Sequence, residues 1–343
     1  MKQPETIDDA PIMAGAGGQG MLGRRRRGRG PAAREPGSRP RGFPVATYSI
    51  VARDAETGQL GVAVQSHYFS VGSVSPHADA GVAAVTIQSF AKPSYGTEGL
   101  RLIREGASAH EALATLRGRD EHAEYRQSAM VDTQGRVAVY TGERCIPEAG
   151  HHSGDGYACL GNMLLERDIW DRMGDAFEAA KGDLVDRLIV ALEAAQSAGG
   201  DLRGRRSAAV IIVAAEASGD PALDVLFNLR VEDHDQPLQE LKRLVLLKRA
   251  FHHNSRGDHH LRNGDVDAAL REFSMAVAMA PAHEELVFWQ AVAMAVAGFR
   301  KEAEPLFREL FDSSRNWRLL AERVAKSRYL PEGSHALDEI LAR

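Results

Sequence analysis

Aromatic residues are scarce in this sequence, and basic residues are not in excess. Tryptophan, tyrosine and phenylalanine together make up 6% of the 343 residues, and the formal net charge is −5. A surface that binds single-stranded nucleic acid needs aromatic side chains on which bases stack. It also needs basic residues that neutralise phosphates. These two shortages argue against a nucleic-acid-binding protein.

Cysteine is nearly absent. Cys145 and Cys159 are the two cysteines, and their spacing matches neither a C-x-x-C motif nor a framework of paired cysteines. This excludes a disulfide scaffold and a zinc site built from cysteine. Nothing else in the sequence indicates a metal or another cofactor, so we expect neither.

Long apolar runs are also missing. No stretch approaches the roughly 18 apolar residues that span a bilayer. The basic run from Arg24 to Arg27 is followed by glycine, proline and arginine, whereas a secretory signal peptide continues with an apolar segment. We therefore expect a cytoplasmic protein that does not bind membranes.

The composition that remains is that of a globular protein preceded by a leader. The chain is 44% hydrophobic and 26% charged, as is usual for folded domains, and its length suits two domains. Residues 1–46 are rich in glycine, arginine and proline, so they cannot bury enough apolar surface to offset their ordering entropy. We predict a disordered leader, with a basic tail that contacts an acidic partner as the alternative.

Residues 47–235 read as a domain of grouped strands and helices. Two β-rich runs, 47–52 and 59–66, flank a turn and predict a hairpin. Ser108 and Glu111 form a capping box at the start of a helix. Further strands are expected at 71–74, 81–89, 128–132, 136–140, 157–160, 208–214 and 223–231, and helices at 97–104, 168–179 and 184–196. Because the elements are grouped rather than alternating, they predict an α+β sandwich of antiparallel sheets between outer helical layers, not a parallel doubly wound sheet.

Residues 236–343 are almost wholly helical and repeat internally. Gly264, Ala269 and Phe273 recur 34 residues later as Gly298, Ala303 and Phe307, which is the tetratricopeptide period. We predict two tetratricopeptide-like repeats, then a rudimentary third unit at 317–328 and a capping helix near residue 337. Two repeats are seldom stable by themselves, so we expect this tail to pack against the first domain.

A family resemblance adds to this picture. The matching segments are TYSIVARDAETGQLGVAVQS (47–66), VGS (71–73), AGVAAVTIQSFAKPSYGTEGL (80–100), YTGERC (140–145), AGHHSG (149–154), GNML (161–164), AAQSAGGDLRGRRSAA (194–209) and LRVEDHDQPLQELKRL (229–244). Together they resemble domain-of-unknown-function family 1028, which is grouped with the N-terminal-nucleophile hydrolases. The resemblance implies a four-layer α-β-β-α sandwich and a nucleophile at the first residue of the first strand, here Thr47.

The physical case for Thr47 depends on a free α-amine. A threonine hydroxyl needs a base to take its proton. An α-amine, with a pKa of about 7.7–8.0, is roughly a tenth neutral at pH 7 and lies on the same residue. Forty-six residues precede Thr47, so self-cleavage, trimming or a later translation start would be required. The alternative is that Thr47 is a strand residue present for its β-propensity.

Other candidates for the site are loop residues. Asn162, after Gly161, can donate to an oxyanion or simply occupy a turn. Asp201 can orient the amine of Thr47 and Arg203 can bind a substrate carboxylate, or the two can brace their loop as an ion pair. Ser66 and His67 end the second strand, where Ser66 can hydrogen-bond the nucleophile and His67 is either a proton shuttle or a surface residue.

Two histidine clusters are weaker candidates. His151 and His152 lie in a glycine-bounded loop after Cys145, but no pattern there would orient a cysteine–histidine dyad. His252, His253, His259 and His260 lie on one predicted helix, without the carboxylate ligands of a metal site.

Two functional hypotheses follow from these patterns. In the first, the chain is an amide-bond hydrolase that acts on a small amide or peptide. In the second, it is a non-catalytic module whose helical repeats dock a protein partner. The substrate, the partner and any homo-oligomer stay open.

Overall fold

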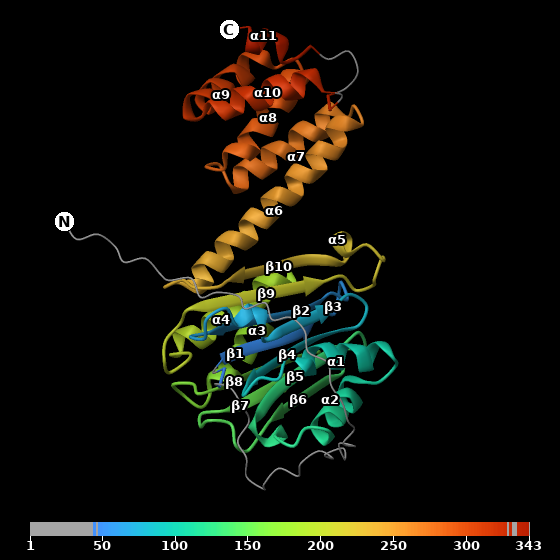
Figure 1. Cartoon of the computed structure of the whole chain (residues 1–343), viewed down its shortest axis with the longest axis vertical. Coiled ribbons are helices and arrows are strands. Elements are labelled where there is room, and N and C mark those ends of the chain that lie inside the picture. Colours follow the sequence, from blue (N-terminus) through green and yellow to red (C-terminus); the bar gives the residue numbers. More distant parts are fainter. Residues whose placement is uncertain (1–43, 46, 328, 331–334, 343) are drawn as a thin grey trace, which may run out of the picture. The chain divides into compact units, whose positions relative to one another are not determined.

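The computed structural model describes residues 44–45, 47–327, 329–330 and 335–342. Within these residues the chain forms two antiparallel sheets, helices that pack on them, and a helical C-terminal stretch (Figure 1). This is the mixed architecture of helices and antiparallel sheets that the sequence predicted. The predicted disordered leader, 1–46, lies outside the described residues except for Pro44 and Val45.

The larger sheet has the strand order β10-β9-β2-β1-β8-β7. Its centre is the predicted hairpin of β1 (Thr47–Arg53) and β2 (Leu60–Ser66), in which Tyr48 pairs with Gln65. Asp54 shapes the turn because its carboxylate accepts the backbone N–H of Thr57 at 2.8 Å. The other strands are β7 (Gly150–Gly154), β8 (Tyr157–Asn162), β9 (Ser207–Val213) and β10 (Val225–Val231).

The smaller sheet has the order β3-β4-β5-β6. Its strands are β3 (Pro76–Asp79), β4 (Ala83–Ser89), β5 (Arg126–Asp132) and β6 (Val137–Thr141). β4 and β5 contact β1 and β8 of the larger sheet. Alternate residues of these strands face the other sheet, and an apolar cluster fills the space between them, including Val51, Leu60, Val62, Ala84, Ala129, Val131, Ala158 and Leu160.

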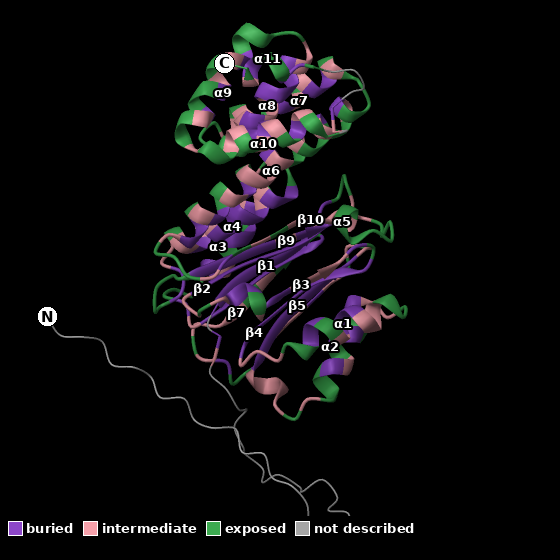
Figure 2. Ribbon diagram, turned by 45° about the horizontal axis from the view of Figure 1, so that its top comes forward, coloured by how far each residue is buried: buried purple, intermediate pink, exposed green. Residues whose placement is uncertain are grey.

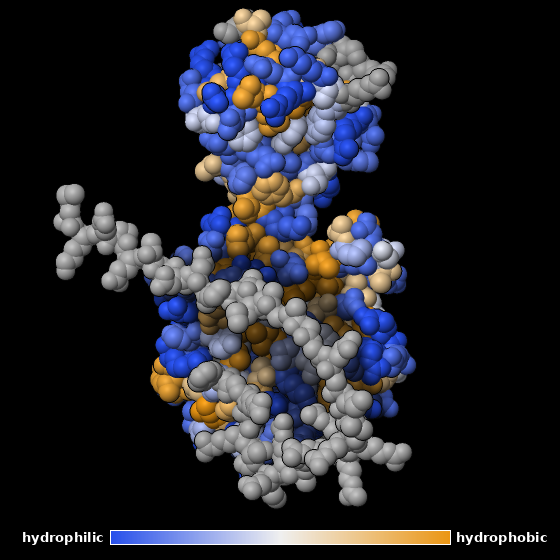
Figure 3. Space-filling model, in the orientation of Figure 1, coloured by the Kyte–Doolittle hydropathy of each residue, from blue (hydrophilic) through white to orange (hydrophobic). Residues whose placement is uncertain are grey.

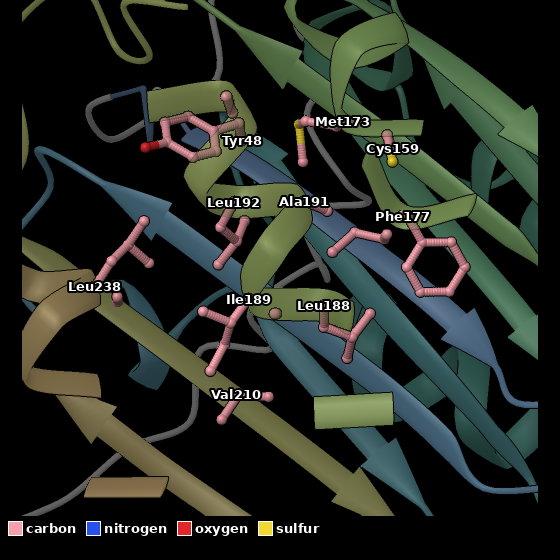
Figure 4. Packing of buried hydrophobic residues seen from close by; sticks show 14 of the residues in the cluster. Tyr48, Cys159, Met173, Phe177, Leu188, Ile189, Ala191, Leu192, Val210 and Leu238 are labelled. Carbon is pink, nitrogen blue, oxygen red and sulfur yellow. The ribbon is translucent and has the colours of Figure 1, made fainter. Parts of the chain in front are cut away.

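Helices cover both sheets on the faces turned away from each other. α1 (Ser94–Arg104) and α2 (Ala109–Gly118) pack on the smaller sheet, and α3 (Ile169–Ala179) and α4 (Leu184–Ser197) on the larger. Figure 4 shows side chains of α4 above Val210 of β9. Buried residues line the sheets, whereas exposed residues lie on the outer faces of the helices (Figure 2).

The predicted capping box at the start of α2 is present. The backbone N–H of Glu111 donates to the Ser108 hydroxyl at 3.2 Å, and the backbone N–H of Ser108 donates to the Glu111 carboxylate at 2.8 Å. Two otherwise unpaired donors of the first turn are thereby satisfied. The spacing of these two residues was therefore a reliable helix signal.

Several local predictions were wrong. Residues 71–74 form not a strand but a 3-10 turn, η1 (Val71–Ser73), whose Gly72 lies so close to Ala209 that an added Cβ would be 2.7 Å from its side chain. The expected run 81–89 begins in a turn at Gly81, where φ is 67°. The expected loop around the paired histidines is strand β7. A short helix, α5 (Pro221–Asp224), precedes β10 because Asp220 caps it and proline opens it.

The C-terminal stretch consists of antiparallel helices that pack in sequence order. They are α6 (Pro237–Arg262), α7 (Val266–Met279), α8 (Glu284–Val296), α9 (Arg300–Ser313), α10 (Arg315–Lys326) and α11 (Asp338–Leu341). Gly264 and Gly298 follow α6 and α8 with φ values of 79° and 87°, a conformation that suits glycine. Phe273 and Phe307 are buried between the helices.

The first half of α6 packs against the larger sheet. Leu238, Leu241 and Val245 belong to the same apolar cluster as α4 and β9, and Arg249 pairs with Asp183 and Asp186 at 2.9 and 2.8 Å. Within the described part of the chain, no helix has the length and apolar character that crossing a membrane would require.

Candidate functional site

One end of the space between the two sheets is polar instead of apolar. We call these residues the polar layer, and all of them are completely buried: Thr47, Ser49, Ser75, Thr86, Gln88, Gln127 and Asn162. Six of them share this location because alternate positions of β1, β4, β5 and β8 face the opposite sheet, and Ser75, just before β3, joins them through a hydrogen bond of 3.1 Å with the Thr86 hydroxyl. The layer begins where the apolar cluster between the sheets ends.

Hydrogen bonds join β1 to β4 across the layer. The Thr86 hydroxyl donates to Ser49 Oγ at 3.1 Å, and the Ser49 hydroxyl donates to Gln88 Oε1 at 2.7 Å. Gln88 Nε2 then donates to the backbone carbonyl of Thr47 at 3.2 Å. The backbone of Thr47 is therefore held by a side chain from the opposite sheet.

Gln127 is the residue with the most contacts in this network. Its Nε2 donates to the carbonyls of Gly161 and Gly150 at 2.8 and 3.0 Å and to Thr141 Oγ1 at 2.9 Å. Its Oε1 accepts from Gln88 Nε2 at 2.7 Å and from Asn162 Nδ2 at 3.1 Å. One side chain from β5 thus fixes the ends of β7 and β8 in the other sheet.

Two buried oxygens of the layer lack hydrogen-bond partners within the described residues. These are Thr47 Oγ1 and Asn162 Oδ1, which belong to residues directly opposite each other in the β1–β8 register. An unpaired buried polar atom is costly and calls for an explanation. A ligand or an amine that donates N–H groups at this point would satisfy both oxygens.

The remaining predicted residues gather at the same end of the larger sheet. Ser66 is buried at the end of β2, and its Oγ accepts the backbone N–H of Tyr68 at 2.8 Å. Asp201 is 3% exposed and forms a β-bridge with Leu164, two residues after the strand partner of Thr47. Its carboxylate accepts the backbone N–H of His67 at 3.0 Å.

Asp201 and Arg203 form an ion pair with each other. Arg203 Nη2 and Nε lie 2.9 and 3.1 Å from the two carboxylate oxygens, and the Arg203 backbone N–H donates as well at 2.9 Å. This is the loop-bracing alternative that the sequence left open. The roles of Asp201 toward an amine and of Arg203 toward a substrate carboxylate stay predictions.

The residues of the cysteine–histidine alternative do not form a dyad. Burial raises the pKa of Cys145, whose thiol contacts the carbonyl of Arg126 at 3.5 Å, so its thiolate is disfavoured. Burial, followed by the charge of His152, lowers the pKa of His151, whose Nδ1 lies 2.9 Å from Thr141 Oγ1. The structure gives this weak candidate no support.

Three of the four histidines of α6 contact side chains of the helical stretch, while the ring of His252 lies against Phe227 of β10. His253 Nδ1 contacts Glu272 at 2.7 Å, and His260 Nδ1 lies 3.4 Å from Asp265. Among the residues that the structure describes, no group of three or more histidine, cysteine, aspartate or glutamate side chains is arranged to hold a metal ion.

A surface pocket of about 610 Å³ adjoins the polar layer. Thr141 and Gly150, which both accept hydrogen bonds from Gln127, lie in its wall. Glu148 and Arg167 are also part of the wall and pair with each other at 3.0 Å. The pocket brings solvent to the residues that contact Gln127.

Five residues of the polar layer were not predicted from the sequence: Ser49, Ser75, Thr86, Gln88 and Gln127. A signal was present, since Thr86 and Gln88 alternate with apolar residues in AVTIQS, and Gln127 is the second residue of a strand that continues SAMV. Polar residues at alternate strand positions usually face solvent. They are buried here because the second sheet covers that face.

Comparisons with known proteins place the chain in a family. No curated protein matches it. Among solved structures, protein SPO2555 from Silicibacter pomeroyi, titled as a member of DUF1028, is similar at a TM-score of 0.53 and 29% identity over 58% of this chain and 84% of that one. Anbu (ancestral beta-subunit) from Yersinia bercovieri aligns over 58% of this chain and 93% of its own at 12% identity, but its TM-score of 0.30 is too low to support an argument. The model of DUF1028, a family of unknown function, matches residues 47–241, more than half of the chain, and the chain therefore belongs to this family.

Proposed function

We propose that this chain is an N-terminal-nucleophile hydrolase that cleaves an amide bond with Thr47. The observation that carries the proposal is the buried, unpartnered hydroxyl of Thr47 at the start of β1. The polar layer around it contains only serine, threonine, glutamine and asparagine, none of which accepts a proton at neutral pH. A base must therefore come from elsewhere, and a free α-amine on Thr47 is the nearest source.

The reaction begins once the bond before Thr47 has been broken. The α-amine takes the hydroxyl proton as Thr47 Oγ1 attacks the substrate carbonyl. The same proton then passes to the leaving nitrogen as the amide C–N bond breaks, which leaves an ester on Oγ1. The amine next takes a proton from water, whose oxygen attacks the ester carbonyl, and the acid product leaves as Oγ1 regains a proton.

Neighbouring groups position this chemistry. Gln88 holds the Thr47 carbonyl, and Gln127 holds the amide of Asn162. The unpaired Asn162 Oδ1 can accept a hydrogen bond from the freed α-amine, while the backbone of this strand end can donate to the oxyanion. Ser66 and the braced Asp201–Arg203 loop would line the same end of the sheet, with His67 at its edge.

The fold proposal has two parts. The two face-to-face sheets with helices on their outer sides support an N-terminal-nucleophile sandwich of four layers. The tail is proposed to be tetratricopeptide-like, because an added Cβ on Gly257 would lie 2.9 Å from the Phe273 ring. That close approach of α6 and α7 is the packing for which the repeat pattern uses small residues.

Mass spectrometry and turnover measurements together test the proposal. We expect the active protein to begin at Thr47. Thr47→Ala should remain uncleaved and lose turnover of a panel of chromogenic amides by at least about a thousandfold, since the other hydroxyls of the layer, on Ser49, Ser75 and Thr86, are already hydrogen-bonded to one another or to Gln88. Thr47→Ser should retain part of the activity. An active preparation whose chains are intact through residue 46 would refute the mechanism.

A second candidate is a binding module without catalysis. The exposed Leu246 and Val190 line a pocket of about 550 Å³ between α4 and α6, with Lys242 and Glu193 at its rim. Hydrophobic residues also gather in Figure 3 around the end of α6 that lies next to β10. Capture of a protein partner that depends on Leu246 but is unaffected by Thr47→Ala would favour this function over the hydrolase.

A further inference from the structure

Val45, two residues before Thr47, is built into the end of the smaller sheet. Its backbone N–H donates to the Ser89 carbonyl at 2.6 Å, and the Ser89 N–H donates to the Val45 carbonyl at 3.0 Å. Ser89 is completely buried and ends β4 in a left-handed conformation, with φ at 65°. Val45, just ahead of the candidate nucleophile, is therefore held by an isolated antiparallel β-bridge.

The side chain of Val45 fills an apolar pocket. Val45 is 4% exposed and packs against Val64, Val71 and Ala209, which are completely buried. Tyr68, Val74 and Ala91 complete this wall. We call these six residues the Val45 pocket. It accepts one branched apolar side chain.

Removal of the leader would leave this arrangement without an occupant. The Ser89 carbonyl would keep the N–H of Ala91, which donates to it at 2.8 Å. The Ser89 N–H would lose its partner in a buried place, which is unfavourable. An extended peptide restores that hydrogen bond, whereas an amide without a second peptide group does not.

We infer that the Val45 pocket binds the acyl side of the substrate, and that the substrate is an extended peptide with a valine-sized apolar residue. This inference rests on the proposed hydrolase function. The leader is then an internal competitor that occupies the same pocket until it is cut. Position two before the nucleophile is where a substrate chain leading to Thr47 would run.

Peptide binding to the full chain tests this inference without turnover. The background is Thr47→Ala, which keeps the leader attached, and the probe is fluorescein-labelled Phe-Pro-Val-Ala-amide, the sequence of residues 43–46. We expect no binding to Thr47→Ala alone and binding after Val45→Asp is added, because a buried carboxylate is expelled from an apolar pocket. The same probe with aspartate in place of valine should bind at least about tenfold more weakly.

The controls separate the possible failures. Thermal unfolding checks that the Val45→Asp chain is folded. If that chain does not fold, Val45→Gly takes its place, because it opens the pocket without adding charge. No binding to either variant, or equal affinity for the valine and aspartate probes, would overturn the inference. Binding without any cleavage at Thr47 in the wild-type chain would instead refute the hydrolase and keep the peptide site. Cleavage of amides by a chain that begins at Thr47, without inhibition by the valine probe, would instead support the hydrolase and refute the peptide site.

Discussion

Replacing Gln127 with leucine should destabilise the protein more than any other single polar substitution in the layer. Leucine is similar in size but cannot bond to the groups that now contact the amide. The Asn162 amide loses its hydrogen bond to Gln127 Oε1, and the carbonyls of Gly161 and Gly150 lose that from Nε2. Thr141 Oγ1 keeps its contact with His151, so the loss of its hydrogen bond from Gln127 has little effect on stability.

The expected cost follows from these lost bonds. Each buried polar group left unpaired costs about 1–3 kcal/mol. Gly150 lies in the wall of the surface pocket, where water can replace its lost bond. With the two groups on Gly161 and Asn162 left unpaired, the free energy of unfolding should fall by about 2–4 kcal/mol, a large part of the 5–15 kcal/mol typical of a domain. Urea unfolding followed by circular dichroism measures this change, provided the slope of the transition is unaltered.

Gln134→Leu is the matched control, because Gln134 is exposed in the turn between β5 and β6. Its effect should stay within about 0.5 kcal/mol. If Gln127→Leu were as mild as Gln134→Leu, Gln127 would not be the link between the sheets that its contacts indicate. The reasoning about the polar layer would then be wrong.

Two further predictions concern the helical tail and the smaller sheet. Gly257→Ala should lower the stability measured by thermal unfolding by about 1–2 kcal/mol, because the new Cβ lies 2.9 Å from the Phe273 ring. Gly118→Ala, with open space around it, should be neutral or slightly stabilising. Equal effects of the two substitutions would contradict the close packing of α6 and α7. Burial alone raises the pKa of Asp120, but the hydrogen bond and charge of Arg126 outweigh it and hold this pKa below its ordinary value. The pair therefore contributes stability above the unfolded pKa of about 3.9 and loses it as pH falls through the folded value. Asp120→Asn should lower the free energy of unfolding by about 3 kcal/mol at pH 7 and by progressively less below pH about 4. The same substitution at the exposed Asp155 should have no such pH dependence. A loss of stability in Asp120→Asn that did not change with pH would contradict this assignment.

The sequence predicted the parts of the fold that local patterns determine. The hairpin of β1 and β2 follows from alternation around a turn, and the start of α2 from Ser108 and Glu111. Strand β7 was missed because histidines and glycines carry little strand signal, and Gly150 is required there by the Trp170 ring, 2.4 Å from an added Cβ. That contact comes from α3 and is invisible in a local window.

The candidate site was predictable only in outline. Thr47 was identified from its place at the first strand and from a family resemblance. Gln88 and Gln127 could not be predicted from the sequence, because their role depends on which face of each sheet the other sheet covers. The ion pair between Asp201 and Arg203 was one of two open readings, and a choice between them requires the distances.

Helix α6 has a consequence for where this protein can be divided. Its residues Leu238 to Val245 complete the apolar cluster of the larger sheet, while Leu261 belongs to the cluster of the tail. The family match ends at residue 241, inside this helix and before Val245. A fragment that ends at residue 241 would lose helical turns that shield β9 and β10 from water. Domain boundaries taken from the family match alone would therefore expose an apolar surface on the isolated sandwich, and the fragment would tend to aggregate.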